Sequence, residues 1–276
     1  MKPAPALQRP PSINHTPLAQ VARILAVASG KGGVGKSTVT VNLAHALTAL
    51  GQRVGILDAD IYGPSIPRML GLETYLKPEI SDGQMLPPTA HGIRAMSMAL
   101  ITGEEAAVLR APMITKALVQ FLRLTRWGDA QHPLDILLVD LPPGTGDVTL
   151  SLAQNAPLDG LVLVTTPQEV AVIDADKCAQ AFHKLQVPLR GVVENMSYFT
   201  DPAGTNHPLF GQGGGAKLAE KYHSRLLGQL PLDPAIGVCA DHGKNFLTQH
   251  PASDASTALR AIARQLVLVN EKGSAA

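Results

Sequence analysis

One glycine-rich segment constrains the fold of this chain more than any other part of its sequence. It reads Gly30-Lys31-Gly32-Gly33-Val34-Gly35-Lys36-Ser37, between the apolar run 24–29 and a helix-like stretch at 37–50. Glycines at this spacing let successive backbone N–H groups surround phosphate oxygens, and the following helix adds the positive end of its dipole. Lys36 would then reach the β- and γ-phosphates, and the Ser37 hydroxyl would bind Mg²⁺. The segment predicts a site for a Mg-nucleoside triphosphate, which we expect to be ATP.

Short apolar runs rich in Val, Ile and Leu alternate with helix-like stretches along the rest of the chain. Continuous runs of this kind are typical of parallel strands that are buried on both faces. The expected strands are 24–29, 54–58, 136–140, 161–165, 189–194 and 226–230, and the expected helices are 37–50, 113–126, 171–185 and 253–270. This alternation predicts the three-layer α/β fold of P-loop NTPases, a mainly parallel sheet with helices on both faces.

Proline and glycine usage indicates how the chain is divided. Residues 1–23 carry five prolines and no apolar core, so we expect a tail that is neither a signal peptide nor a helix. Residues 24–270 are long enough for one large domain, followed by a short tail at 271–276. Prolines also crowd residues 62–88, which we expect to be a long, partly irregular excursion, and 196–215 is loop-rich.

Charge and cysteine content exclude several classes of protein. The formal net charge is only +1, whereas a nucleic-acid or membrane-surface binder usually has surplus Lys and Arg. No apolar run approaches the roughly 18 residues that a membrane span requires. The two cysteines, Cys178 and Cys239, match no close metal-ligand spacing and fit a reducing compartment. We therefore expect a cytoplasmic protein without nucleic-acid or membrane partners.

Three aspartates lie at the expected carboxyl ends of strands. Asp58 and Asp60 follow the second apolar run, and Asp140 ends the run 136–140. A single aspartate at such a place often only caps a turn or a helix, but a Mg²⁺ site beside bound phosphates needs carboxylates here. Beyond Asp140, the prolines and glycines of residues 141–147 predict a loop beside the γ-phosphate that can distinguish ATP from ADP.

Several motifs together resemble a known family. Lys31, as an extra lysine inside the glycine-rich segment, resembles the deviant P-loop of the ParA/MinD and nitrogenase-iron-protein class. Within that class, segments 58–65, 140–147, 194–199 and 210–214 resemble the Mrp/ApbC family of iron–sulfur cluster carrier ATPases. The resemblance runs from about residue 24 to residue 270.

The resemblance implies a homodimer that binds ATP at the subunit interface and serves apo iron–sulfur client proteins. Lys31 would reach the phosphates of the other subunit, acting with Lys36 and with Asp60, which would position the attacking water. Asp58 and Asp140 would join Ser37 around Mg²⁺. The implied nucleotide-binding residues are Gly30, Lys31, Gly32, Gly33, Val34, Gly35, Lys36, Ser37 and Thr38 around the phosphates, with Asn195, Pro231 and Asp233 at the adenine.

The sequence departs from the family at the cluster site. Most members place a Cys-x-x-Cys pair just after the Tyr-Phe, and two such pairs would hold a bridging 4Fe–4S cluster between subunits. Residues 200–204 read Thr-Asp-Pro-Ala-Gly here, although an iron–sulfur cluster requires soft thiolates. We expect Cys178 and Cys239 to be small buried residues and Asp201 and His207 to belong to a polar loop. Two alternatives stay open: an ATPase that carries or assembles clusters, and an ATP-driven switch that binds a protein partner without a cluster.

Overall fold

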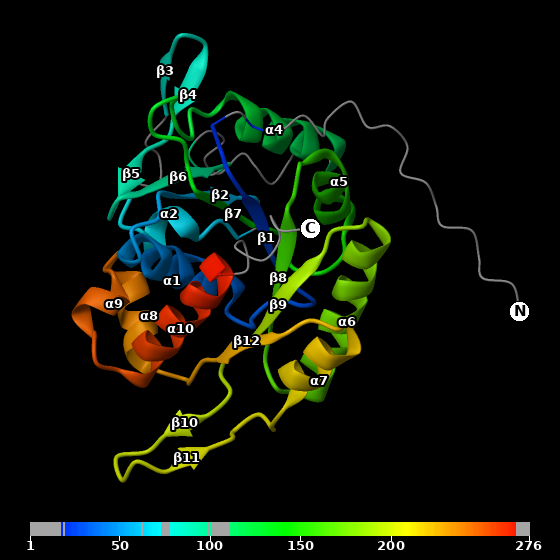
Figure 1. Cartoon of the computed structure of the whole chain (residues 1–276), viewed down its shortest axis with the longest axis vertical. Helices are drawn as coiled ribbons and strands as arrows, with labels where there is room; N and C mark the ends of the chain where they lie inside the picture. Colours follow the sequence, from blue (N-terminus) through cyan, green and yellow to red (C-terminus); the bar gives the residue numbers. More distant parts are fainter. Residues whose placement is uncertain are drawn as a thin grey trace, which may run out of the picture.

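The computed structural model describes residues 18, 20–61, 63–72, 78–98, 100 and 111–268 (Figure 1). The predicted tail over residues 1–23 therefore falls outside the described residues except at 18 and 20–23, where Val21 forms a parallel bridge with Leu134. The predicted tail at 271–276 lies wholly outside them.

An eight-stranded sheet forms the middle of the molecule, in the order β12-β9-β8-β1-β7-β2-β6-β5. Its strands are β1 (Ile24–Ser29), β2 (Val54–Asp58), β5 (Thr89–Ala90), β6 (Ile93–Ser97), β7 (Ile136–Asp140), β8 (Gly160–Thr165), β9 (Leu189–Glu194) and β12 (Leu226–Gln229). All neighbouring strands are parallel except β5 and β6, which are antiparallel. The predicted mainly parallel sheet is confirmed.

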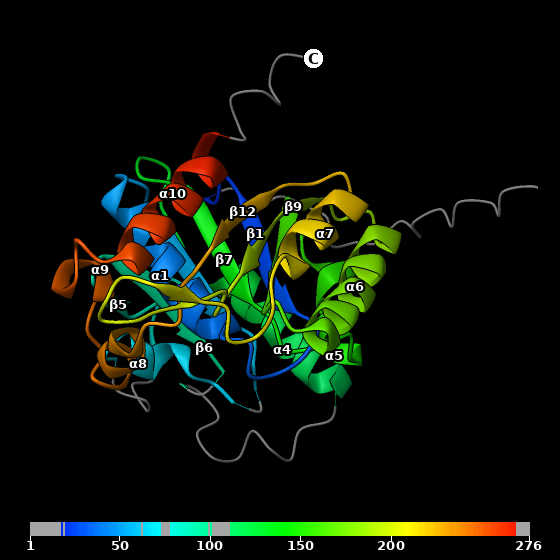
Figure 2. The same ribbon diagram turned by 90° about the horizontal axis from the view of Figure 1, so that it is seen from below.

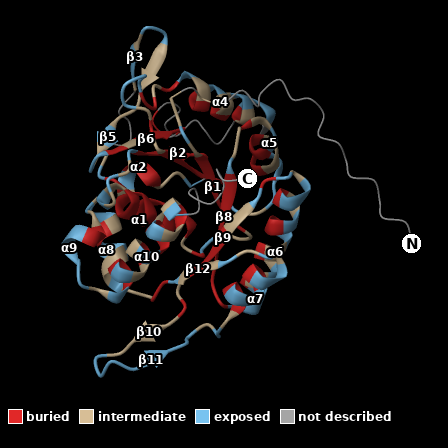
Figure 3. Cartoon of the chain, in the orientation of Figure 1, coloured by how far each residue is buried: buried red, intermediate tan, exposed pale blue. Residues whose placement is uncertain are grey.

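Helices cover both faces of this sheet (Figure 2). One face carries α1 (Lys36–Ala49), α2 (Ile66–Met69), α8 (Pro234–Asp241), α9 (Phe246–Gln249) and α10 (Asp254–Leu268), and the other carries α4 (Ala111–Leu124), α5 (Asp147–Asn155), α6 (Glu169–Lys184) and α7 (Gly214–Lys221). Side chains of β1 alternate between the two cores: Ile24 and Ala26 pack on one side, and Leu25 on the other. Both faces of the central strands are therefore buried (Figure 3), as their continuous apolar sequences predicted.

The described part of residues 62–88 contains short regular elements between irregular stretches, in agreement with the expected partly irregular excursion. A hairpin forms from β3 (Glu79–Ser81) and β4 (Gln84–Leu86), joined by Asp82 and Gly83. Both joining residues have positive φ, 52° and 73°, which is the Asp-Gly signal of a two-residue turn. Strand β6 was also missed, because Arg94 interrupts its short apolar run.

The part of the chain that the structure describes contains no helix with the length and apolar character needed to cross a bilayer. The predicted helix at 253–270 is described as far as Leu268, and Ser253 caps it by accepting a hydrogen bond from the Ser256 N–H. Its apolar stripe faces the core, since Leu259, Ile262 and Leu266 are buried.

Candidate nucleotide-binding site

The glycine-rich segment connects β1 to α1 at the carboxyl edge of the sheet. Gly33 and Gly35 have φ values of 81° and 80°, a left-handed conformation that other residues rarely adopt. Gly30 lies against the backbone of α6, where an added Cβ would stand only 2.0 Å from the carbonyl carbon of Asp174. Backbone geometry therefore requires glycine at three positions of the segment. The loop leads directly into α1, a helix of 14 residues.

Where this loop meets α1, the side chains of Lys36 and Ser37 both contact Asp140 at the end of β7. The Lys36 ammonium and the Ser37 hydroxyl each lie 2.6 Å from Asp140 Oδ2, and Thr40 donates to Asp140 Oδ1 over 2.6 Å. Lys36 is 6% exposed and Asp140 is fully buried. Because removal of either charge leaves the other buried without a partner, the ion pair couples the stability of the fold to the site.

Asp58 lies beside Asp140, since the two residues are directly opposite each other on the parallel strands β2 and β7. Its carboxylate accepts hydrogen bonds from the Asp60 N–H and from the Ser97 hydroxyl. Burial, reinforced by the negative charge of Asp140, raises the pKa of Asp58 to about 8. Lys36 contacts Asp140 directly, and its positive charge partly offsets the rise in the pKa of Asp58.

These residues fit a magnesium ion. Mg²⁺ is held in proteins through one or two carboxylates, water and substrate phosphates, and its positive charge offsets the repulsion that raises the pKa of Asp58. The hard oxygens of Asp58, Asp140 and Ser37 are the donor set that this ion prefers. When held by these residues, the ion would neutralise negative charge that develops on the phosphate groups.

Asp60 faces a second part of the site. Its Oδ1 accepts the Gly63 N–H over 3.3 Å, which places it in the loop between β2 and α2. Together with the loop after β7 and the start of α5 it lines a cavity of about 520 Å³. The other lining residues are Gly63, Pro142, Pro143, Gly146, Asp147, Val148 and Thr149.

The three residues expected at adenine are placed differently from one another. Asn195 reaches the glycine-rich segment, where its side-chain N–H donates to the Val34 carbonyl over 2.9 Å. Pro231 and Asp233 line a separate cavity of about 240 Å³, and Asp233 caps α8 by accepting from the Ala235 N–H. A backbone hydrogen bond joins the two loops, because the Ser197 N–H donates to the Leu230 carbonyl. Thr38 lies in the first turn of α1.

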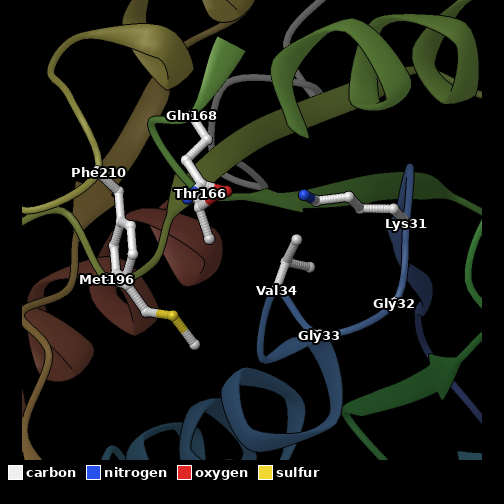
Figure 4. Close-up of a pocket in the computed structure, with 8 residues that line it drawn as sticks. All are labelled: Lys31, Gly32, Gly33, Val34, Thr166, Gln168, Met196 and Phe210. Atoms are coloured by element: carbon white, nitrogen blue, oxygen red, sulfur yellow. The ribbon is translucent and has the colours of Figure 1, made fainter. Parts of the chain in front are cut away.

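Lys31 points into a further cavity of about 220 Å³ (Figure 4). Besides residues of the glycine-rich segment, the lining contains side chains from three distant loops: Thr166, Gln168, Met196 and Phe210. Sequence reasoning missed these residues, and it also missed Thr40, whose position three residues beyond Ser37 on the helix was the available signal.

The loop expected to be polar forms a hairpin of β10 (Phe199–Thr200) and β11 (Asn206–His207), which projects from the body (Figure 1). Asp201 stabilises it by accepting the N–H groups of Ala203 and Thr205. His207 Nε2 lies 2.7 Å from Asp201 Oδ2, and this hydrogen bond lowers the pKa of Asp201. Among the described residues no group of three or more His, Cys, Asp or Glu side chains is arranged to hold a metal ion.

Both cysteines are buried, as predicted. Cys178 lies on the buried face of α6 and is fully buried, and Cys239 on α8 is 4% exposed. Burial raises the pKa of the Cys178 thiol to about 12 and also raises that of Cys239. The two cysteines belong to separate cores on opposite faces of the sheet, so within one chain they do not form a pair that could hold a cluster.

Comparison with known proteins finds similar chains among both curated sequences and solved structures. The iron–sulfur cluster carrier protein of Escherichia coli K12 is 51% identical over 246 residues, which cover 88% of this chain and 65% of that protein. The chain thus spans just under two thirds of the length of this relative. Among solved structures, an ADP complex of a nucleotide-binding protein from Archaeoglobus fulgidus is 38% identical with a TM-score of 0.73, covering 83% of this chain and 89% of that one.

The fold extends to more distant proteins. The cell division ATPase MinD of Pyrococcus furiosus is 21% identical with a TM-score of 0.67, covering 90% of this chain and 99% of that chain. One family model, described as ParA: NUBPL iron-transfer P-loop NTPase, matches residues 20–267. From this match and the 51% identity above, the chain belongs to the iron-transfer P-loop NTPase family.

Proposed function

We propose that this chain binds and hydrolyses Mg-ATP. The observation that carries the proposal is the convergence of Lys36, Ser37 and the Asp58–Asp140 pair at the mouth of a glycine loop that opens a helix. Loop N–H groups and Lys36 bind the phosphates, Ser37 with the two carboxylates holds the magnesium shell, and Asp60 orients the attacking water. The ADP complex of the similar protein from Archaeoglobus fulgidus supports nucleotide binding by this chain.

The active form that we propose is a homodimer. Lys31 has no ion-pair partner within the described part of the chain, and it lines an open cavity at the glycine-rich segment. A lysine supplied to the phosphates of the other subunit would stabilise the charge that develops during phosphoryl transfer, as an arginine finger does.

Lys31→Ala is expected to keep nucleotide binding and to lower ATP turnover by about 10³-fold, the lower end of the effect of a finger residue. Turnover and nucleotide affinity are measured over a range of protein concentrations, because a residue acting in trans requires two chains. Lys177→Ala is the matched control, since Lys177 is an exposed lysine on the neighbouring α6 that pairs with Asp174. Normal turnover in Lys31→Ala would contradict the trans role.

The biological role that we propose is cytoplasmic iron–sulfur cluster delivery or assembly, with apo iron–sulfur proteins as clients. The family and the names of the relatives support it. The position and burial of the two cysteines favour a second candidate, an ATP-driven switch that binds a protein partner and carries no cluster. Both candidates use the same ATP site.

Iron and sulfide content after anaerobic reconstitution separates these candidates. A dimer that holds cluster iron and sulfide acts as a carrier, whereas a colourless dimer with full ATP turnover and ATP-dependent capture of a specific partner acts as a switch. In either case the double variant Cys178→Ala/Cys239→Ala is expected to contain as much iron as the wild type, because both thiols are buried. Loss of iron in that variant would overturn the assignment of both cysteines to the core.

A further inference from the structure

One buried carboxylate lies beside the nucleotide site, and the ATP chemistry proposed above does not use it. Glu194 is the last residue of β9, directly before Asn195, and it is fully buried. Within the part of the chain that the structure describes, no lysine, arginine or histidine forms an ion pair with it. Burial of a carboxylate without a paired cation is unfavourable, so its hydrogen bonds have to replace the lost water.

Hydrogen bonds from three segments meet at this carboxylate. The Gly215 N–H at the start of α7 donates to Oε2 over 2.6 Å, and the side-chain amide of Gln229 at the end of β12 donates to Oε1 over 2.7 Å. The Ser197 hydroxyl lies 3.0 Å from Oε1 and 2.8 Å from the carbonyl oxygen of Glu194. The carboxylate of Glu194 therefore joins the turn after β9 to both β12 and α7.

The turn that follows Glu194 is strained. Met196 has a φ of 54°, a left-handed conformation that is unfavourable for a residue other than glycine. Such a conformation persists only where the surrounding contacts enforce it. Ser197 supplies contacts on one side, because its hydroxyl meets Glu194 and its N–H donates to the Leu230 carbonyl over 2.9 Å. Loss of the Glu194 carboxylate is therefore expected to loosen this turn.

The same turn places Asn195 on the glycine-rich segment. The Asn195 backbone N–H donates to the Thr165 carbonyl over 2.8 Å, and its side-chain amide donates to the Val34 carbonyl over 2.9 Å. This amide lies so close to the segment that a Cβ added at Gly35 would stand only 2.3 Å from its nitrogen. A small rotation of the turn would break the hydrogen bond or press the amide into the segment.

We propose that Glu194 is a positioning residue for the nucleoside part of Mg-ATP. Its carboxylate acts through the turn, by fixing the place of Asn195, the residue expected at the adenine. The phosphate part of the site depends on other groups, namely the loop N–H groups, Lys36 and Ser37. Glu194 thus determines how tightly the nucleoside binds and leaves phosphoryl transfer unchanged. This inference rests on the ATP site proposed above.

The test compares Mg-ATP with Mg-tripolyphosphate, which has the phosphates but no nucleoside. Glu194→Met keeps the approximate size of the side chain and removes both acceptor oxygens. We expect the KM for Mg-ATP to rise about tenfold, the effect of one hydrogen bond to a charged group, with kcat unchanged. The inhibition constant of Mg-tripolyphosphate against ATP turnover is expected to keep its wild-type value. Glu194→Gln, which keeps the shape and one acceptor oxygen, should restore most of the affinity.

Two further variants make the experiment independent of how well Glu194→Met folds. Ser197→Ala removes only the hydroxyl that links the turn to the carboxylate, and it should raise the KM for Mg-ATP without affecting Mg-tripolyphosphate. Asp176→Asn is the matched control, because its carboxylate accepts hydrogen bonds from Lys221 and Tyr222 and joins α6 to the end of α7 opposite Gly215. We expect wild-type kinetics in this control.

The outcomes separate this inference from the proposed function. Equal weakening of Mg-ATP and Mg-tripolyphosphate would show a general loosening of the site and overturn the positioning role. Wild-type kinetics in both Glu194→Met and Ser197→Ala would also overturn it. If the wild type neither bound nor hydrolysed Mg-ATP, the proposed function would be wrong, and this inference with it.

Discussion

Lys36→Ala is expected to weaken Mg-ATP binding by roughly 100-fold or more, because a buried cation that contacts the phosphates is removed. The same change should lower the free energy of unfolding by about 3–5 kcal/mol, since it leaves Asp140 buried without its 2.6 Å ion-pair partner. Nucleotide titration and chemical denaturation measure the two effects separately.

The double variant Lys36→Met/Asp140→Asn separates binding from folding. The double variant leaves no charge at position 140, and the buried Asp58 can stay protonated because burial raises its pKa to about 8. The introduced amide oxygen would still accept a hydrogen bond from Thr40. We expect this variant to recover most of the lost stability and still fail to bind Mg-ATP. If it bound nucleotide as the wild type does, the phosphate role of Lys36 would be wrong.

Asp60→Ala is expected to lower ATP turnover by about 10²–10⁴-fold while leaving nucleotide affinity unchanged, because a group that positions the attacking water acts mainly in the transition state. Single-turnover hydrolysis of bound ATP is the direct measurement. Asp60 lies in a loop that borders a cavity, so the fold should tolerate the loss of its side chain.

Asp147→Ala is the matched control for this experiment. Asp147 lines the same cavity as Asp60, but it lies in the first turn of α5, where a carboxylate stabilises the helix N-terminus. We expect turnover close to that of the wild type. Equal losses in both variants would show that the cavity needs negative charge in general, and normal turnover in Asp60→Ala would refute the water-positioning role.

The fold brings together the residues that the sequence assigned to the phosphate loop, because their signals are local. The glycine-rich segment, the apolar strand before it and the helix after it are contiguous, so their order along the chain determines the loop. Asp58 and Asp140 lie side by side, since parallel strands that end in a carboxylate bring it to the same edge of the sheet. The hairpin turn at Asp82 and Gly83 carried an equally local signal that was missed.

Tertiary structure alone decided the partners of these residues. The Lys36–Asp140 ion pair joins positions 104 residues apart, and the Asn195 contact with the glycine-rich segment joins positions 161 residues apart. No spacing rule along the chain encodes such contacts, because they depend on which strands become neighbours and how the connecting loops pack. The sequence by itself thus determined a phosphate loop with an extra lysine at position 31. Only the fold placed that lysine in a shared cavity with Thr166 and Gln168 and buried both cysteines away from the surface.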